Sequence, residues 1–269
     1  MKNEKYFRSK RIFSTFAAMF TYISDSLFHV GRYFSLVSRS FSKPEKASIF
    51  RKRIFEEIDK LGISSLPMVI IISFFMGAVI TIQAAVGFES PWIPLYAVGV
   101  TTRDSVILEF APTLVSLILA GKVGSSIASE IGTMRVSEQI DALEIMGVNS
   151  ASHLILPKII AAVFINPFLI VISMFTGILG GLFLGSITNV VTPYQYLYGI
   201  QYDFRLYNVT YSLIKTVVFA FIIASVPAYH GYFTRGGALE VGKSSTVAVV
   251  YSSLLILLFN FILTQLLLA

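Results

Sequence analysis

The chain has 269 residues, of which 55% are hydrophobic and only 13% are charged, and its mean hydropathy is +0.76. A soluble domain carries about 25% charged residues, so this composition excludes a soluble globular protein and indicates an integral membrane protein. The sequence has no cysteine, which excludes disulfides, a thiol nucleophile and a thiolate metal site. Lys and Arg exceed Asp and Glu by 21 to 15, and their distribution fits a membrane surface better than a nucleic acid.

Residues 1–60 form a basic N-terminal region that holds 13 of the 21 Lys and Arg residues. Apolar residues from Phe13 to Val37 recur at three- and four-residue steps, which places them on one face of a helix. Charged residues interrupt any full membrane span in this stretch. We therefore expect a helix that lies in the bilayer interface, packs on the bundle, or does both. Residues 48–61 form a second amphipathic segment, with basic residues suited to anionic head groups.

The remaining chain, 61–269, is predicted to be one membrane domain. A helix needs about 20 apolar residues to cross a bilayer, and five stretches reach that length. The predicted spans are about 63–87, 106–128, 157–187, 207–229 and 244–268. Turn formers and tyrosines from Thr188 to Tyr202 are typical of a segment at the membrane interface. The fold class is therefore an all-α integral membrane protein with interfacial N-terminal helices.

The charges that flank the spans predict the orientation of the chain. If residues 1–60, 122–158 and 232–243 share one side, nearly all Lys and Arg lie on that side. The other side carries only Arg103 and Arg205. Because cytoplasmic loops are enriched in Lys and Arg, we expect a cytoplasmic N-terminus. Five spans then place the C-terminus outside.

Polar residues inside the predicted spans are candidates for the lining or gate of a transport path, because burial of a charge in lipid is costly. These residues are Glu109, Lys215, Gln83 and Asn166. Glu109 either gates such a path or holds helices together by pairing with Lys215 or Arg103. Lys215 either contacts a phosphate group, snorkels or pairs. Gln83 suits a contact between helices, and Asn166 before Pro167 suits a kink in the third span.

The third span also carries a face of small residues. It is made of Gly177, Gly180, Gly181 and Gly185. Such a face lets helices approach closely, either at a homodimer seam or within the chain. Packing within the chain is the expected role.

Polar and apolar residues mix most closely between the second and third spans, from Leu119 to Pro157. We predict a short helix from Thr133 to Met146 with one acidic and one apolar face, ended by Gly147 as its cap. Its polar candidates for docking a soluble partner are Arg135, Glu138, Gln139, Asp141 and Glu144. A helix of this kind between two spans suits contact with a partner in the cytoplasm.

This stretch resembles the signature of the MlaE-type permeases, the membrane subunits of ABC transporters that move phospholipid between bacterial membranes. Four segments match that pattern in order: Gly121–Ser125, Glu130–Met134, Glu138–Leu143 and Met146–Val148. The segment around Glu109 departs from it, because Leu108 and Ala111 stand where the family has an arginine and a glycine. The residues that carry the resemblance as structural positions are Gly121, Gly124, Ser125, Glu130, Gly132, Gly147, Gly236, Gly237 and Gly242.

The resemblance implies a lipid permease subunit of the bacterial inner membrane, with its C-terminus in the periplasm. Such a permease works as a homodimer with two separate ABC ATPase subunits and, often, an MCE-type lipid-binding protein outside the membrane. Phospholipid is then held in a cavity between the two permeases. The helix from Thr133 to Met146 becomes the coupling helix that receives the push of the ATPase.

The segment Gly237–Ser244 matches the P-loop pattern letter for letter. A P-loop works only between a buried strand and a helix, and here the pattern lies between two membrane spans. We interpret it as the last cytoplasmic loop of the resembled family, with Ser244 as the N-cap of the fifth span. ATP hydrolysis is then left to a partner subunit.

Other classes of function find less support in the sequence. The three histidines are scattered, and neither a paired metal-ligand spacing nor a nucleophile elbow is present, so we expect no enzyme activity, no metal and no cofactor. An ion- or proton-coupled secondary transporter that uses Glu109 and Lys215 is the main alternative. A membrane scaffold that anchors a soluble partner is a third possibility.

Overall fold

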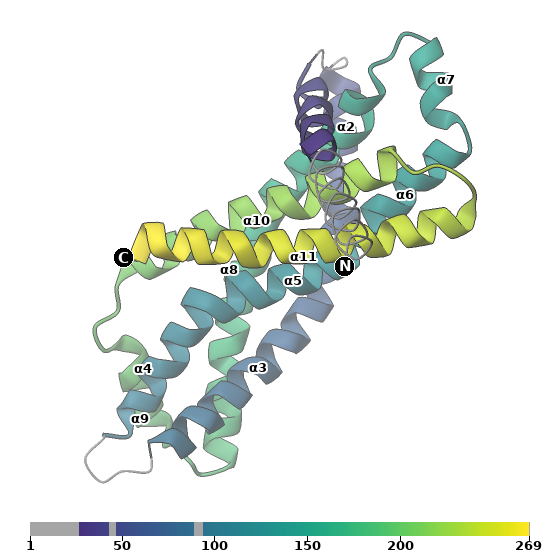
Figure 1. Ribbon diagram of the computed structural model, residues 1–269. Helices are drawn as coiled ribbons and strands as arrows, with labels where there is room; N and C mark the ends of the chain where they lie inside the picture. The colour runs from purple at the N-terminus through teal and green to yellow at the C-terminus, as the bar shows by residue number, and fades with distance from the viewer. Residues whose placement is uncertain (1–26, 43–46, 89–93, 269) are drawn as a thin grey trace, which may run out of the picture.

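The computed structural model describes residues 27–42, 47–88 and 94–268, and every regular element in these ranges is a helix (Figure 1). Five helical segments are long and apolar enough to cross a membrane. They are Phe50–Gly87, Tyr96–Val136, Ser150–Ile187, Leu206–Tyr232 and Ala238–Leu268. The predicted all-α membrane fold with five spans is thereby confirmed.

Most of the crossing helices extend well beyond the apolar stretches that predicted them. The second helix begins at Tyr96 rather than near 106, and the third begins at Ser150 rather than near 157. The length of an apolar stretch reports only the part of a helix that lies in hydrocarbon. The backbone hydrogen bonds of the helix continue into the head-group region, where charged side chains are tolerated.

The N-terminal helix at residues 27–40 both packs on the bundle and presents an apolar edge. Leu27 and Phe34 are exposed, whereas the Tyr33 hydroxyl lies 2.7 Å from the hydroxyl of Ser225 in the fourth crossing helix. Both expected placements are therefore compatible with the structure. The earlier part of the predicted apolar face lies outside the described residues.

The membrane-crossing part of the first helical segment is α3 (Leu66–Gly87), which is preceded by α2 (Ala47–Leu61) and the 3₁₀ turn η1 (Ile63–Ser65). Basic and acidic residues occupy α2, whereas α3 carries no charge. Pro67 lies in the first turn of α3, where its missing N–H leaves no hydrogen bond unmade.

The second crossing changes helix type along its length. It consists of α4 (Tyr96–Ser105), η2 (Val106–Leu114), α5 (Val115–Leu119), η3 (Ala120–Gly124) and α6 (Ser125–Val136). Both η2 and η3 are π-helical, and Pro112 lies inside η2. Proline has no backbone N–H to donate, and π-helical turns occur frequently at functional sites. This segment contains Glu109.

The predicted continuous helix from Thr133 to Met146 is wrong in one respect. Helix α6 ends at Val136, and a separate helix α7 runs over Gln139–Ile145. Glu138 between them has a φ of 60°, a left-handed conformation that ends the first helix and turns the chain. The second crossing thus ends at Val136, and the chain turns at Glu138 into α7.

Gly147 ends α7 as the sequence predicted. Its φ is 76°, which favours glycine, and its N–H donates to the carbonyl of Glu144 at 3.0 Å. The N–H of Val148 donates to the carbonyl of Leu143 at 3.0 Å. These two bonds form a Schellman motif, the commonest glycine-based end of a helix.

The third crossing is the uninterrupted helix α8 (Ser150–Ile187), which Asn149 caps by accepting a hydrogen bond from the N–H of Ser152. It ends at Ile187, where the sequence predicted its end. The interfacial segment that follows contains a helix that the sequence did not predict, α9 (Pro193–Gln201). Helix α9 lies against α4 at the opposite end of the molecule from α7 (Figure 1).

The last two crossings are α10 (Leu206–Tyr232) and α11 (Ala238–Leu268). The expected N-cap role of Ser244 is wrong, because α11 begins at Ala238. The Ser244 hydroxyl instead donates to the carbonyl of His230 at 2.9 Å and ties α11 to α10. Most of the P-loop-like segment is therefore helical and does not form a phosphate-binding loop.

The glycine face of α8 packs within the chain, as expected. A side chain at Gly180 would collide with the backbone carbonyl of Phe74 in α3, and one at Gly77 would collide with the backbone of Gly177. Thr81 and the hydroxyl of Tyr196 similarly fill the space next to Gly181. Close contact between α3 and α8 thus depends on glycine at both sides of the crossing.

The buried side chains form two hydrophobic clusters. The main cluster runs along the bundle from the N-terminal helix to α11. A small cluster lies where α3, α4 and α9 meet, and it is built on Ala85, Val98, Val191 and Tyr196. This second cluster lies at the end of the molecule farthest from α7 (Figure 1).

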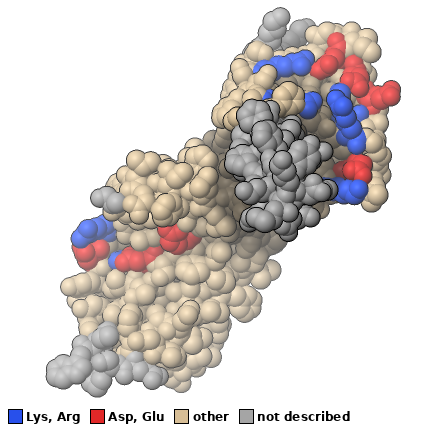
Figure 2. Space-filling view, viewed as in Figure 1, with Lys and Arg blue, Asp and Glu red and all other residues tan. Residues whose placement is uncertain are grey.

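Charged side chains gather at the end of the molecule that carries α7, whereas most of the remaining visible face is uncharged (Figure 2). Large apolar side chains cover the outer faces of α3, α8 and α11, including Phe75, Phe175 and Leu254. Helix α11 is the least buried of the crossing helices, since only 17% of its most apolar stretch is buried. The chain therefore leaves wide apolar faces for lipid or for another chain.

Candidate functional site

Glu109 and Lys215, which the sequence indicated as candidates, form an ion pair inside the membrane-spanning bundle. The Lys215 Nζ lies 3.0 Å from Oε1 of Glu109, and it also donates to the carbonyl of Leu108 at 3.3 Å. The Lys215 side chain is fully buried, whereas 41% of the Glu109 side chain is exposed. Lys215 therefore does not snorkel, and the carboxylate forms the accessible edge of the pair.

A shell of hydroxyl and amide groups completes this ion pair. Lys215 donates to the Tyr211 hydroxyl at 2.9 Å, and Thr264 of α11 lies within 2.9 Å of that hydroxyl. Asn260 of α11 donates to Oε2 of Glu109 at 3.1 Å. Charged groups in a membrane need such partners, because lipid supplies none. The shell joins η2, α10 and α11 into one polar cluster.

The alternative partner for Glu109, Arg103, has a different role. Its Nε donates to the carboxylate of Asp104 at 2.9 Å, and its Nη1 donates to the carbonyls of Ile200 and Tyr202 at 2.9 and 2.7 Å. These carbonyls lie at the end of α9, where no further helical turn supplies N–H groups to donate to them. Arg103 thus fixes α9 onto α4.

The other two candidates inside the spans lie apart from the ion pair. Gln83 is exposed on the outer face of α3, on the same stripe as Phe75 and Val79. Asn166 is buried on α8. Neither residue belongs to the Glu109 cluster, so the four predicted candidates do not form one site.

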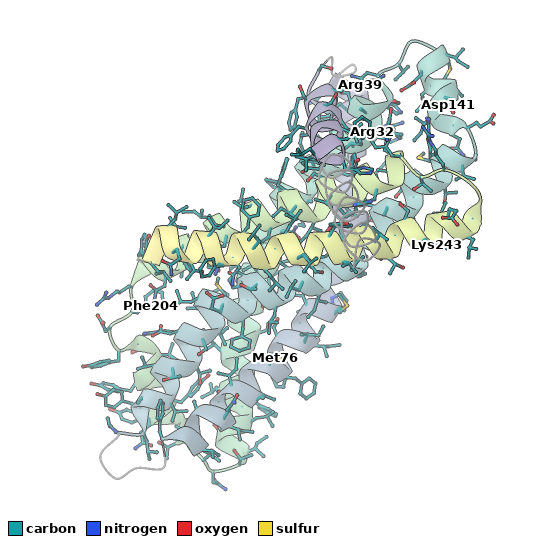
Figure 3. The ribbon with its side chains drawn as sticks, in the orientation of Figure 1. Arg32, Arg39, Met76, Asp141, Phe204 and Lys243 are labelled. Atoms are coloured by element: carbon teal, nitrogen blue, oxygen red, sulfur yellow. The ribbon has the colours of Figure 1, made fainter. Side chains whose placement is uncertain are left out.

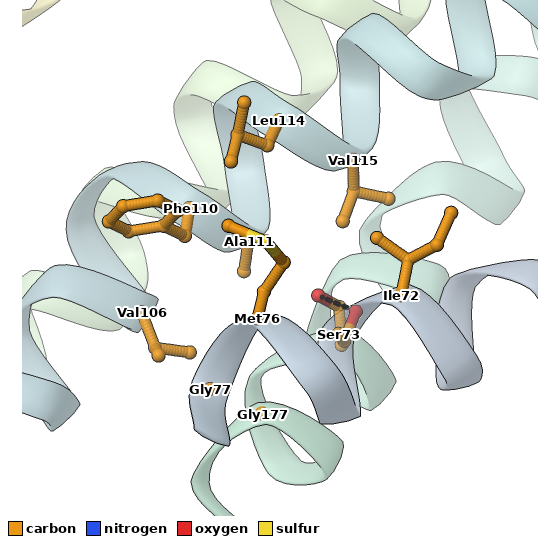
Figure 4. Close-up of a pocket in the computed structure, with 11 residues that line it drawn as sticks. Ile72, Ser73, Met76, Gly77, Val106, Phe110, Ala111, Leu114, Val115 and Gly177 are labelled. Carbon is orange, nitrogen blue, oxygen red and sulfur yellow. Dashed lines mark hydrogen bonds between the residues drawn. The ribbon is translucent and has the colours of Figure 1, made fainter. Parts of the chain in front are cut away.

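A small apolar cavity lies beside η2, between α3 and α8 (Figure 4). It has a volume of about 20 Å³, and Met76 points into it from α3 towards Phe110 and Ala111 of η2. The hydrogen-bonded hydroxyls of Ser73 and Ser173, 2.7 Å apart, form one of its walls. A water molecule needs about 10–15 Å³, so this cavity has room for about one water molecule and does not hold a lipid.

Helix α7 lies apart from the Glu109 cluster and exposes both polar and apolar side chains. Ile145 and Met146 at its C-terminal end are 88% and 68% exposed, which is unusual for large apolar side chains next to water. Glu138 and Gln139 at its N-terminal end are exposed as well. In contrast, Ile140 is fully buried against the bundle.

The other charged residues of this segment hold it in place. Arg135 Nη1 lies 2.6 Å from Oδ1 of Asp141, which ties the end of α6 to α7. Glu144 lies 3.1 Å from Arg39 of the N-terminal helix, and Figure 3 shows Arg39 and Asp141 at the same end of the molecule. Of the five predicted docking residues, three are thus engaged inside the chain and two face outwards.

The electrostatic environment of Glu144 favours its charged form. Its pKa is held below the ordinary value, first because the Ser150 hydroxyl donates to it at 2.8 Å, and further because Tyr232 donates at 2.9 Å and Arg39 is near. Partial burial opposes this shift. The carboxylate therefore joins α7, α8, α10 and the N-terminal helix while ionised.

Several residues that carry the family resemblance serve packing or chain reversal. A side chain at Gly124 would press on Pro227, and one at Gly132 would press on Val241. Gly147 and Gly236 have positive φ values, of 76° and 112°. The remaining residues are placed differently: Gly121, Gly237 and Gly242 have open space around them, and the Ser125 carbonyl accepts a hydrogen bond from Ser245.

Glu130 belongs to a charge cluster that sequence reasoning missed. Lys158 is almost fully buried, and its Nζ lies 2.6 Å from Glu57 and 3.0 Å from Glu130. Lys60 contacts Glu130 at 2.5 Å as well. The cluster thus joins α2, α6 and α8 near the charged end. A Lys directly after a proline at the start of a span was the available signal, but one partner, Glu57, lies about a hundred residues away in the sequence and the other, Glu130, lies on a different helix.

The polar partners on α10 and α11 were also missed. Tyr211 lies one helical turn before Lys215, and Asn260 lies one turn before Thr264. That spacing inside two apolar spans was a readable signal for a polar face. Among the described residues, no group of His, Asp and Glu is arranged to hold a metal ion.

Five crossing helices, an ion pair inside their bundle and a short exposed helix between two crossings indicate an integral membrane protein with a polar site among its helices. Comparison with known proteins agrees. The chain belongs to the MlaE permease family: the family described as Permease MlaE matches residues 54–266.

Relatives with assigned names extend over most of the chain. A probable ABC transporter permease protein of Rickettsia bellii is 39% identical over 220 residues, which cover 79% of this chain and 82% of the relative. One of Synechocystis is 37% identical over 238 residues, covering 87% and 88%. The chloroplastic protein trigalactosyldiacylglycerol 1 of Arabidopsis thaliana is 30% identical over 220 residues, covering 82% of this chain and 63% of that protein. The chain is thus an ABC transporter permease, which implies an ATPase partner.

Proposed function

We propose that this permease moves phospholipid, works as a homodimer, and is driven through α7 by a separate ABC ATPase subunit. The observation that carries the proposal is α7, a short helix between two crossings whose exposed end combines Glu138 and Gln139 with Ile145 and Met146. Exposed apolar anchors rimmed by polar residues are typical of a protein docking surface. Family membership supplies the partner that would dock there.

The internal contacts of α7 give a route for force. The Arg135–Asp141 pair ties α7 to the second crossing, and the Glu144–Arg39 pair ties it to the N-terminal helix. Helix α8 follows the Schellman turn directly. A movement of α7 caused by nucleotide binding would therefore reach three elements at once. Nucleotide can do transport work only if it binds two such states differently.

Phospholipid as the substrate is supported by the surfaces of the chain. The cavity beside η2 is far too small for a lipid, whereas α3, α8 and α11 carry broad exposed apolar faces. A lipid held between two copies would meet such faces and the accessible carboxylate of Glu109. The name of the Arabidopsis relative is that of a diacylglycerol lipid. An MCE-type protein outside the membrane would exchange lipid at the end that carries α9.

The proposed location is the bacterial inner membrane. We assign residues 61–269 to the permease domain and 1–60 to an interfacial region on the cytoplasmic side. The charged end that carries α7 faces the cytoplasm, in line with the positive-inside rule, and the C-terminus faces the periplasm. An ion-coupled secondary transporter finds no support among the named relatives.

Reconstitution tests the proposal. The chain is co-expressed with the ATPase encoded nearest to it, purified, and placed in liposomes that contain fluorescent phospholipid. We expect one complex with two copies of this chain, ATP hydrolysis, and ATP-dependent transfer of lipid to an acceptor. A stable complex that hydrolyses ATP without moving lipid would overturn the substrate. A chain that recovers no ATPase would overturn the coupling.

A further inference from the structure

A second polar pocket, separate from the ion pair, lies where α10 ends and α11 begins. It has a volume of about 250 Å³. Residues from the end of α10, the following loop and the first turns of α11 line it: His230, Thr234, Arg235, Glu240, Lys243 and Ser244. The pocket lies at the charged end of the molecule, where Figure 3 shows Lys243.

The pocket has a fixed floor and a positive rim. Thr234 and Ser244 lie 2.9 Å apart, and both hydroxyls reach the carbonyl of His230, at 2.8 and 2.9 Å. Lys243 pairs with Glu240 at 2.6 Å, and its side chain remains 62% exposed. Arg235 is exposed, and within the described ranges no acidic group lies at ion-pair distance from it. Two cations against one carboxylate leave a net positive charge.

The face of α11 that lines the pocket continues as an apolar strip into the membrane. Val247 lines the pocket, and Tyr251, Leu254 and Leu258 follow at three- and four-residue steps on the same face. Their exposed fractions are 41%, 52%, 58% and 52%. The Tyr251 ring stacks on the His230 ring at the pocket, with centroids 5.4 Å apart. An aromatic side chain at this level is typical of the boundary between head groups and hydrocarbon.

We propose that this pocket binds the phosphate of an anionic phospholipid in the leaflet on the α7 side, with the acyl chains along α11. A basic pocket at head-group level above an apolar strip has the shape and charge of such a lipid. The inference requires only the membrane-spanning fold and goes beyond the proposed transport function. A free phosphate ion shares the head-group chemistry, but it has no acyl chains to contact the apolar strip of α11.

Site-specific quenching tests the proposal, since the chain has no cysteine. A bimane label on Leu254→Cys is placed in nanodiscs of phosphatidylcholine that contain a minor fraction of brominated phosphatidylglycerol or brominated phosphatidylcholine. We expect stronger quenching by the anionic lipid. Replacement of Arg235 and Lys243 by Gln should reduce that preference by roughly fivefold for each cation. A label on Phe75→Cys, equally exposed on α3, should show no preference.

A matched variant separates the pocket from general surface charge. Lys52→Gln removes an exposed cation on the same side that is also paired with an acid one turn away. It should leave the preference intact. Equal quenching by both lipids, or a preference unchanged by the double variant, would overturn the proposal. Loss of the preference on addition of inorganic phosphate would assign the pocket to the free ion instead. ATP-driven lipid transport, assayed in parallel, reports separately on the proposed function.

Discussion

Lys215 is the most deeply buried charge of the bundle core, and it depends on one carboxylate. Removal of one partner of a buried ion pair leaves the other without compensation. We expect Glu109→Gln to lower the stability of the chain by about 3 kcal/mol, the lower end of the usual range, because Glu109 is partly exposed. The measurement is thermal unfolding in detergent, followed by circular dichroism.

The double variant Glu109→Gln with Lys215→Gln serves as the internal control. With both charges gone, no buried ion remains uncompensated, and the double variant should be more stable than Glu109→Gln alone. If the two losses simply add, the pair does not stabilise the bundle and Lys215 has another partner.

Glu144 makes the attachment of α7 sensitive to pH. Its pKa is lowered in the folded chain by the Ser150 hydrogen bond and the other contacts of the carboxylate, so its contribution is complete above the ordinary glutamate pKa of about 4.3. The contribution is lost as the pH falls through the lower folded-state pKa. We expect the difference in Tm between wild type and Glu144→Gln to be constant near neutral pH and to shrink in acid. A difference that grows in acid would contradict this assignment.

At the residue scale, the sequence predicted which intramembrane residues are unusual but not always what they contact. Glu109 and Lys215 were identifiable because a charge in lipid needs a reason. Their pairing remained one of several options, since pairing depends on which helices meet. The burial of Lys158 was missed because a single Lys at the start of a span also fits the head-group region. Its partner Glu57 lies in a segment that was interpreted as surface.

At the element scale, α3 and α8 pack closely because glycines without side chains lie at their contact. Gly180→Ala places a methyl group against the backbone carbonyl of Phe74, which cannot move aside as a flexible side chain could. We expect a loss of about 1–3 kcal/mol, typical of overpacking. Gly121→Ala, which meets open space, should be neutral or stabilising by about 0.5–1 kcal/mol. Equal Tm values for the two variants would contradict the packing argument.

Helix α7 is the element whose surface should decide ATPase binding. Glu138→Lys changes an exposed acid that already has a positive φ, and Met146→Asp places a charge on the apolar end. Each variant should reduce recovery of the ATPase in a pull-down by about tenfold or more, as expected for a docking anchor. Asp203→Lys is a matched control, because Asp203 is also exposed with a φ of 47° but lies beyond α9.

The sequence predicted elements well where hydrophobicity determines them and poorly where it does not. All five crossings, the end of α8 and the glycine cap of α7 were predictable from apolar length and turn chemistry. Helix α4 lies before the predicted start of the second span near 106, because Arg103 and Asp104 interrupt the apolar stretch. The π-helical segments and α9 left no periodic signal. Ser244 looked like a cap because its type fits, although the helix begins earlier.

At the scale of the whole molecule, charge and hydrophobicity are separated along one direction. Most charged side chains of the visible face collect at the α7 end, a smaller group lies towards the other end, and uncharged residues cover most of the rest (Figure 2). This separation was predictable from the sequence, because the flanking charges alone sort the loops into two sets. What the sequence could not supply is the arrangement of crossings around the Glu109 cluster, which brings together residues far apart in the chain.

The two hydrophobic clusters have a consequence for local stability. Helices α4 and α9 depend on the small cluster around Tyr196, on close backbone contact at Gly99 and Gly199, and on Arg103. The main cluster does not include α9. Regions with few buried contacts open with less free energy than the rest of a protein. Amide hydrogens of α9 should therefore exchange with deuterium long before those of α10. This end of the permease then opens locally while the main helical bundle remains folded.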